Sequence, residues 1–156
     1  MNLDFLKPKA PPLIGVDISS SAVKMVELTQ TGRNYSLERY VIEPLPKDAV
    51  TDNNIVNAEA VALAIRNAWR RMGSKVKNVA AALPASAVIT KKILVQAGMS
   101  ERELEIQVET EANQYIPFSL DEVNLDFQVL GFAANNPDEE DVLIAAAKKD
   151  KVDERV

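Results

Sequence analysis

The sequence contains no cysteine and no histidine, and these two absences remove whole classes of chemistry. Without cysteine there are no disulfides and no thiolate nucleophiles, and without either residue the usual zinc ligand sets are missing. An imidazole base is excluded as well. Any catalysis would therefore depend on Asp, Glu, Ser, Thr, Lys or Tyr, or on a bound ion.

Basic charge and long apolar runs are also scarce. The net charge is -5, whereas non-specific nucleic-acid binding needs Lys and Arg concentrated on one face. No apolar run approaches the roughly 20 residues that span a bilayer, and the N-terminus lacks both the apolar core and the cleavage site of a signal peptide. We therefore expect a cytoplasmic globular protein that does not bind nucleic acid.

The first 84 residues predict a tail followed by a sheet with one helix. Residues 1–12 read MNLDFLKPKAPP, in which prolines oppose both helix and sheet, so a flexible tail is expected; a docking foot for a partner is the alternative. Apolar patterning then predicts strands at 13–18, 22–28, 35–42 and 79–83. The last of these is apolar on both faces, which predicts a central strand that is parallel to the first and covered by helices. Between them, Asn57 is expected to cap a helix that ends near Met72, with Trp69 in its buried stripe.

Residues 85–156 predict a second unit with a different element order. Strands are expected at 88–95, 123–130 and 142–147, a helix at 100–114, and another helix from about Asp150. The resulting βαββα order is most of a split βαβ, ferredoxin-like unit. Ser100 and Glu103 form a capping box, and Tyr115 is expected in the buried stripe of the helix they begin. The last apolar stripe stops after one repeat at Val156, so we expect a fragment of a longer chain, with this unit truncated.

One polar turn lies between the first two apolar strands. Asp17 is followed by three consecutive hydroxyls, Ser19, Ser20 and Ser21, and then by Lys24 on the next strand. This pattern fits an ordinary hairpin, but it also fits an anion site, because turn N–H groups and hydroxyls donate to anions. Lys24 could neutralise charge, and Asp17 could orient water around a divalent cation.

Two segments carry a resemblance to a known family: LIGVDISSSAVKMVEL at 13–28 and ETEANQYIPFSLDEVNLDFQVLG at 109–131. With these segments the chain, from about Leu3 to Val156, resembles the PilM family of type IV pilus assembly proteins, which are actin-like and related to FtsA. The resemblance implies an α/β fold of the actin-like, ribonuclease-H-like kind. In it, 13–84 would be the first part of subdomain 1A and 85–156 an inserted, ferredoxin-like subdomain 1C.

The resemblance also implies a nucleotide site for ATP and Mg²⁺. The first hairpin would bind the nucleotide phosphates through Asp17, Ser19, Ser20, Ser21 and Lys24, and Asp17 would hold the metal indirectly, through water. The seven-residue step from Asp17 to Lys24 matches the actin pattern, but many relatives have glycine where this chain has Ser19. A second phosphate turn and the adenine pocket would lie beyond Val156, so this stretch should bind nucleotide poorly by itself.

The implied role is a scaffold with at most weak ATPase activity, since no catalytic base can be named. The cytoplasmic N-terminal tail of the membrane protein PilN would dock in a groove between the subdomains, and pilus motor ATPases are further possible partners. The protein would thus be peripheral to the inner membrane, at its cytoplasmic face. We place the loop Ile116-Pro117-Phe118 near the groove, with filling of the core as its alternative role.

Two other functions remain open. A phosphotransferase or a metal-dependent nuclease could use the same architecture, and a nuclease would need further carboxylates converging on Asp17. Glu27 and Glu38 are the nearby strand acids. The other alternative is a purely structural adaptor in which the turn is inert.

Overall fold

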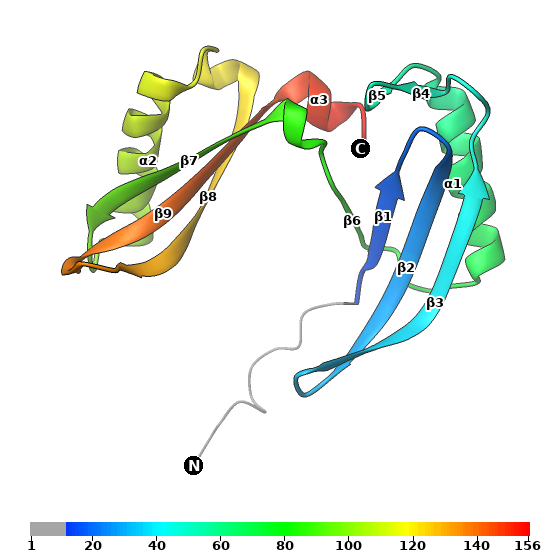
Figure 1. The fold of residues 1–156 in the computed structure, drawn as a ribbon, viewed down its shortest axis with the longest axis horizontal. Helices are drawn as coiled ribbons and strands as arrows, with labels where there is room; N and C mark the ends of the chain where they lie inside the picture. Colours follow the sequence, from blue (N-terminus) through cyan, green and yellow to red (C-terminus); the bar gives the residue numbers. More distant parts are fainter. Residues whose placement is uncertain (1–11) are drawn as a thin grey trace. The chain divides into compact units, whose positions relative to one another are not determined.

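The computed structural model describes residues 12–156 and divides them between Ala82 and Leu83 into two compact units (Figure 1). The prediction of a flexible tail falls almost entirely on residues outside this range. Each unit has its own sheet and its own apolar core, and the predicted boundary at Pro84 lies two residues beyond the division.

The first unit is built on a four-stranded sheet. Its strands are β1 (Ile14–Ile18), β2 (Ala22–Thr31), β3 (Asn34–Pro44) and β6 (Val79–Ala81). The sheet order is β3-β2-β1-β6, with β1 antiparallel to β2 and parallel to β6. The predicted parallel pairing of the first and last strands is therefore confirmed.

Helix α1 (Ala58–Met72) covers one face of this sheet, and its ends form as predicted. The Asn57 side chain accepts a hydrogen bond from the Ala60 N–H at 3.0 Å, and Gly73 takes a left-handed conformation at φ 65°. Val61, Ala64 and Ala68 of α1 pack on the sheet in one buried cluster, with Trp69 partly buried against it.

Two features of this unit differ from prediction. Strand β6 lies at the edge of the sheet with all its residues exposed, so it is not a central strand covered on both faces within residues 12–156. A small hairpin of β4 (Val50–Thr51) and β5 (Asn54–Ile55) was not predicted. Its turn residues Asp52 and Asn53 both have positive φ, which Asp and Asn tolerate better than most residues.

The second unit contains a three-stranded sheet, two helices and two short 3-10 turns. Its strands are β7 (Val88–Gln96), β8 (Val123–Ala133) and β9 (Asn136–Lys148), its helices α2 (Glu101–Tyr115) and α3 (Lys149–Asp153), and its turns η2 (Ala85–Ala87) and η3 (Leu120–Glu122). The order is β7-β9-β8, with β9 antiparallel to both neighbours. This is the predicted split βαβ arrangement.

Helix α2 begins at the predicted capping box. The Ser100 N–H donates to the Glu103 carboxylate at 2.8 Å, and the Glu103 N–H donates back to Ser100 Oγ at 3.4 Å. Leu104 and Val108 pack against buried residues of β7 and β9. Tyr115 is 46% exposed, so its predicted place in the buried stripe is wrong; it lies at the last turn, where its ring contacts Lys91 instead.

Candidate functional site

The polar turn between β1 and β2 is a tight hairpin with Ser20 and Ser21 at its tip. Ser19 donates to the Ala22 carbonyl twice, from its N–H at 3.0 Å and from Oγ at 3.0 Å. No residue of this turn has positive φ. Ser19 is therefore compatible with the backbone, and the glycine of many relatives is not needed for conformation here.

Some hydrogen-bond donors of this turn are bonded within residues 12–156, and others have no partner there. Both donors of Ser19 are satisfied within the turn, and the Ser21 carbonyl accepts from the Leu45 N–H at 2.8 Å. The N–H groups of Ser20 and Ser21 donate to no other group of residues 12–156. Because both residues are exposed, these two amides and their hydroxyls are the donors that an anion could meet first.

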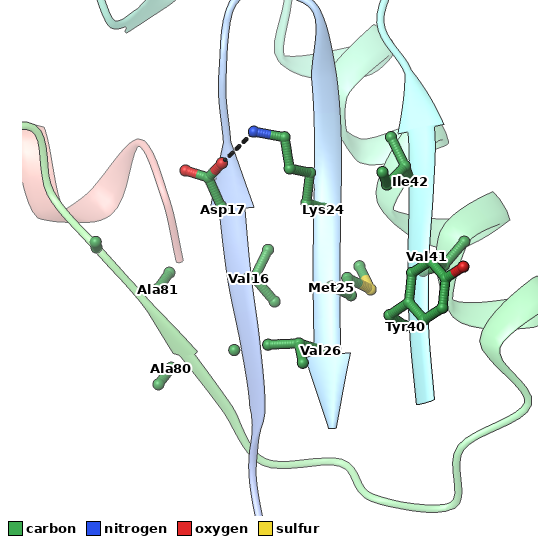
Figure 2. A pocket seen from close by; sticks show the side chains of 12 residues that line it. Val16, Asp17, Lys24, Met25, Val26, Tyr40, Val41, Ile42, Ala80 and Ala81 are labelled. Carbon is green, nitrogen blue, oxygen red and sulfur yellow. Dashed lines mark hydrogen bonds and ion pairs between the residues drawn. The ribbon is translucent and has the colours of Figure 1, made fainter. Parts of the chain in front are cut away.

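Asp17 and Lys24 lie directly opposite each other on β1 and β2 (Figure 2). Lys24 Nζ is 3.0 Å from an Asp17 carboxylate oxygen, and the two side chains are 50% and 63% exposed respectively. The structure thus brings together the acid and the cation that the sequence singled out on either side of the turn. An exposed pair of this kind contributes little to stability, at most about 1 kcal/mol, so both side chains can be redirected to a ligand at small cost.

The same face of the sheet carries an apolar cavity of about 540 Å³. Figure 2 shows Asp17 and Lys24 at one end of this region and Val26, Tyr40 and Ala80 further along the strands. Tyr40 is 68% exposed and Ile42 is 53% exposed. This surface was not predicted, although β3 alternates Tyr40 and Ile42 with the buried Val41, and that alternation predicts two apolar faces.

The donor set fits the phosphates of a nucleotide and an indirectly held cation. Two unused amides, hydroxyls and an ammonium are suitable donors to a polyphosphate, and a lone carboxylate binds Mg²⁺ through water more readily than directly. Residues 12–156 contain no group of three Asp or Glu that could hold a metal ion. Glu27 pairs with Arg39 at 3.2 Å and lies opposite Ile14, at the other end of β1 from Asp17. Glu38 accepts from Thr29 at 2.8 Å, so neither acid converges on Asp17.

The loop predicted to contact a partner connects α2 with η3 in the second unit. Ile116 is 8% exposed and packs with Ala112, Val123 and Ala146, which is the core-filling role considered for this loop. Phe118 is 36% exposed and has the Lys148 ammonium 4.1 Å from the centre of its ring. Of the loop's two large side chains, only Phe118 is thus available to a partner.

Together, the two units are those of an actin-like α/β protein with a ferredoxin-like insertion. Residues 15–156 match the family described as type IV pilus assembly protein PilM. A solved structure described as a PilM-PilN type IV pilus biogenesis complex is similar in fold, with a TM-score of 0.75 and 30% sequence identity over 91% of this chain. The chain spans 42% of the length of that protein. This chain belongs to the PilM family of type IV pilus assembly proteins.

Within residues 12–156 no helix is both long enough and apolar enough to cross a membrane.

Proposed function

We propose that this chain is part of an actin-like scaffold for type IV pilus assembly, one that holds ATP and the cytoplasmic tail of PilN. The observation that carries the proposal is the family match across 15–156, together with the similarity to a structure described as a PilM-PilN complex. In this scaffold, residues 13–84 are the first part of subdomain 1A and 85–156 belong to the inserted subdomain 1C. The scaffold works at the cytoplasmic face of the inner membrane, and pilus motor ATPases are its further partners.

ATP is proposed to bind with its phosphates at the β1–β2 turn. The free amides and hydroxyls of Ser20 and Ser21 donate to phosphate oxygens, and Lys24 leaves Asp17 to neutralise their charge. Ser19 shapes the turn and does not donate to phosphate, because the Ala22 carbonyl already accepts from both its N–H and its hydroxyl. Mg²⁺, when bound, shields phosphate charge, and Asp17 holds its water shell.

In this proposal ATP acts mainly as a structural ligand, with at most weak hydrolysis. A ligand that binds one arrangement of the protein better than another shifts the population toward that arrangement. The PilN tail then binds this arrangement preferentially, and the exposed ring of Phe118 is its proposed contact in the second unit.

The partner assignment is tested with a fluorescent peptide of the PilN cytoplasmic N-terminal tail and a protein of full family length. Fluorescence anisotropy should show saturable binding, and Phe118→Ala should weaken it about tenfold, as expected for an exposed aromatic contact. Phe132→Ala, in a residue 68% exposed on β8, is the matched control and should leave the affinity unchanged. Absence of saturable binding at high micromolar protein would contradict the assignment.

The role of ATP is tested with Asp17→Asn in the protein of full family length. A scaffold should lose the rise in melting temperature that Mg-ATP gives, while phosphate release stays at most weak in both variants. An enzyme should instead lose turnover, and a structural adaptor should show no change in melting or partner affinity with nucleotide in either variant. Thermal melting and phosphate release measured on the same samples distinguish these three outcomes.

A further inference from the structure

The second unit carries a basic and aromatic surface, of which the proposed function uses only the ring of Phe118. It consists of two lysine and aromatic pairs, Lys91 with Tyr115 and Lys148 with Phe118, here called the lysine-aromatic patch. The Lys91 ammonium lies 4.3 Å from the centre of the Tyr115 ring, and that of Lys148 lies 4.1 Å from the centre of the Phe118 ring. Distances of this size are typical of cation–π contacts.

Neither of these lysines has an acidic partner within the described part of the chain. By contrast, the ammonium groups of Lys24 and Lys92 form ion pairs and lie within about 3 Å of a carboxylate oxygen. A ring covers only one side of an ammonium group, so Lys91 and Lys148 each keep donors free for a ligand. The rings also limit the movement of both lysines, which lowers the entropy lost when an anionic group binds.

The sheet register gives the spacing between the backbone positions of the two lysines. Lys91 on β7 lies opposite Ile144 on β9, and Lys148 is four residues further along β9. At about 3.3 Å per residue, this corresponds to about 13 Å along the sheet. Residues i and i+4 of an extended chain have the same spacing and face the same side. The rings that contact the two ammonium groups, Tyr115 and Phe118, are 46% and 36% exposed and provide apolar contact beside the charges.

We propose that the lysine-aromatic patch binds an extended acidic segment of a partner protein, with two carboxylates four residues apart and an apolar residue between them. The inference rests on the proposed function in that Phe118 contacts a partner, and it adds the chemistry of the segment. A narrow segment fits better than an anionic bilayer. The exposed Asp121 and Glu122 follow Phe118 closely in the chain, and a flat anionic surface would be repelled by them.

The test uses a capped eleven-residue peptide with Glu at positions 4 and 8 and Phe at position 6, titrated into the protein by calorimetry. We expect saturable binding, weakened about tenfold both when the two Glu are changed to Gln and in the double variant K91M/K148M, as for two charge contacts. Lys92→Met is the matched control, because it removes the same charge from the same strand at a residue paired with Asp141. It should bind like the original chain.

Three results would overturn the inference: no saturation below about 1 mM peptide, equal affinity for the Glu and Gln peptides, or equal affinity in K91M/K148M. Binding of phosphatidylserine vesicles but not of the peptide would also overturn it, in favour of a membrane surface. The PilN-tail peptide separates this inference from the proposed function. If that peptide binds K91M/K148M unchanged while the Glu peptide does not bind at all, the proposed function stands and the inference fails. If the Glu peptide binds and the PilN-tail peptide does not, the inference stands and the proposed function fails.

Discussion

At the scale of single residues, the ends of the two long helices are set by side chains that the sequence identifies. Asn57 caps α1 by accepting from the Ala60 N–H, one of the donors that the first helical turn leaves without a partner. We expect Asn57→Ala to lower the free energy of unfolding of the first unit by about 1 kcal/mol. Trp69, the single tryptophan, lies on α1, so urea unfolding followed by its fluorescence measures this unit.

Asn57→Asp is the control for this prediction, because its carboxylate can accept the same hydrogen bond. It should retain the stability that Asn57→Ala loses. Equal loss in both variants would mean that the cap is not the source of the effect.

Glu103 makes the stability of α2 depend on pH. The Ser100 backbone N–H, followed by the Ser100 hydroxyl, holds the pKa of this carboxyl below its ordinary value of 4.5. A pKa lowered by folding means that the ionised form stabilises the folded state at neutral pH, and that this contribution is lost as the pH falls below about 4.5 through the folded-state pKa. Hydrogen exchange of the α2 amides should therefore show less protection in Glu103→Ala than in the original chain at pH 6, with a smaller difference at pH 3.

Glu103→Gln separates charge from hydrogen bonding in the same experiment, since glutamine can also complete a capping box. It should keep part of the protection and lose its dependence on pH in this range. A pH dependence unchanged by Glu103→Gln would contradict the assignment to this carboxyl.

At the scale of elements, β2 supplies the buried face on which α1 packs. Met25 is 2% exposed and belongs to the core cluster of the first unit. Met25→Ala should cost about 2 to 4 kcal/mol, because it leaves a cavity that the neighbours fill only in part. Ile42→Ala, at a residue 53% exposed on the adjacent strand, should cost less than about 1 kcal/mol. Trp69 fluorescence during urea unfolding measures both, and similar costs would contradict this account of the two sheet faces.

The elements best predicted from sequence are those with a strong local signal. Val123, Leu125 and Phe127 alternate with polar residues and give β8, and capping residues give the starts of α1 and α2. The first half of β9 has no such signal, because Asn136–Asp141 is polar and acidic. It is a strand because β8 and β7 pair with it from both sides, which a local pattern cannot reveal.

In the candidate site, too, some features follow from a local sequence pattern and others depend on the folded structure. Asp17 and Lys24 can be paired from sequence, since both flank a short turn between strands. The internal use of both Ser19 donors depends on the backbone angles of the turn, which the residue types do not fix. The lysine-aromatic patch joins β7, β9, the end of α2 and the loop after it, so each lysine is far in the sequence from the ring it contacts.

At the scale of the whole molecule, the proposed function needs a turn that binds phosphate in one unit and a surface that binds a partner in the other. The first would depend on the donors of Ser20, Ser21 and Lys24, and the second on Phe118 with its neighbouring lysine Lys148. The chain belongs to the family of type IV pilus assembly protein PilM, which is the setting in which we propose both. Binding of a triphosphate at the hairpin is the central claim, because the structural role of ATP depends on it.

The most direct test is a titration of the isotope-labelled chain with Mg-ATP, followed by the amide signals of each residue. Because the chain spans 42% of the length of the similar solved protein, we expect weak binding, with a Kd of about 1 mM or above. The Ser20 and Ser21 amides should shift most and saturably, and Lys24→Ala should abolish this response. Lys77→Ala is the control and should leave the response unchanged. Lys77 precedes Asn78, whose carbonyl accepts from the Ile14 N–H at the opposite end of the sheet. Unmoved Ser20 and Ser21 signals, or an identical response in Lys24→Ala, would contradict the account.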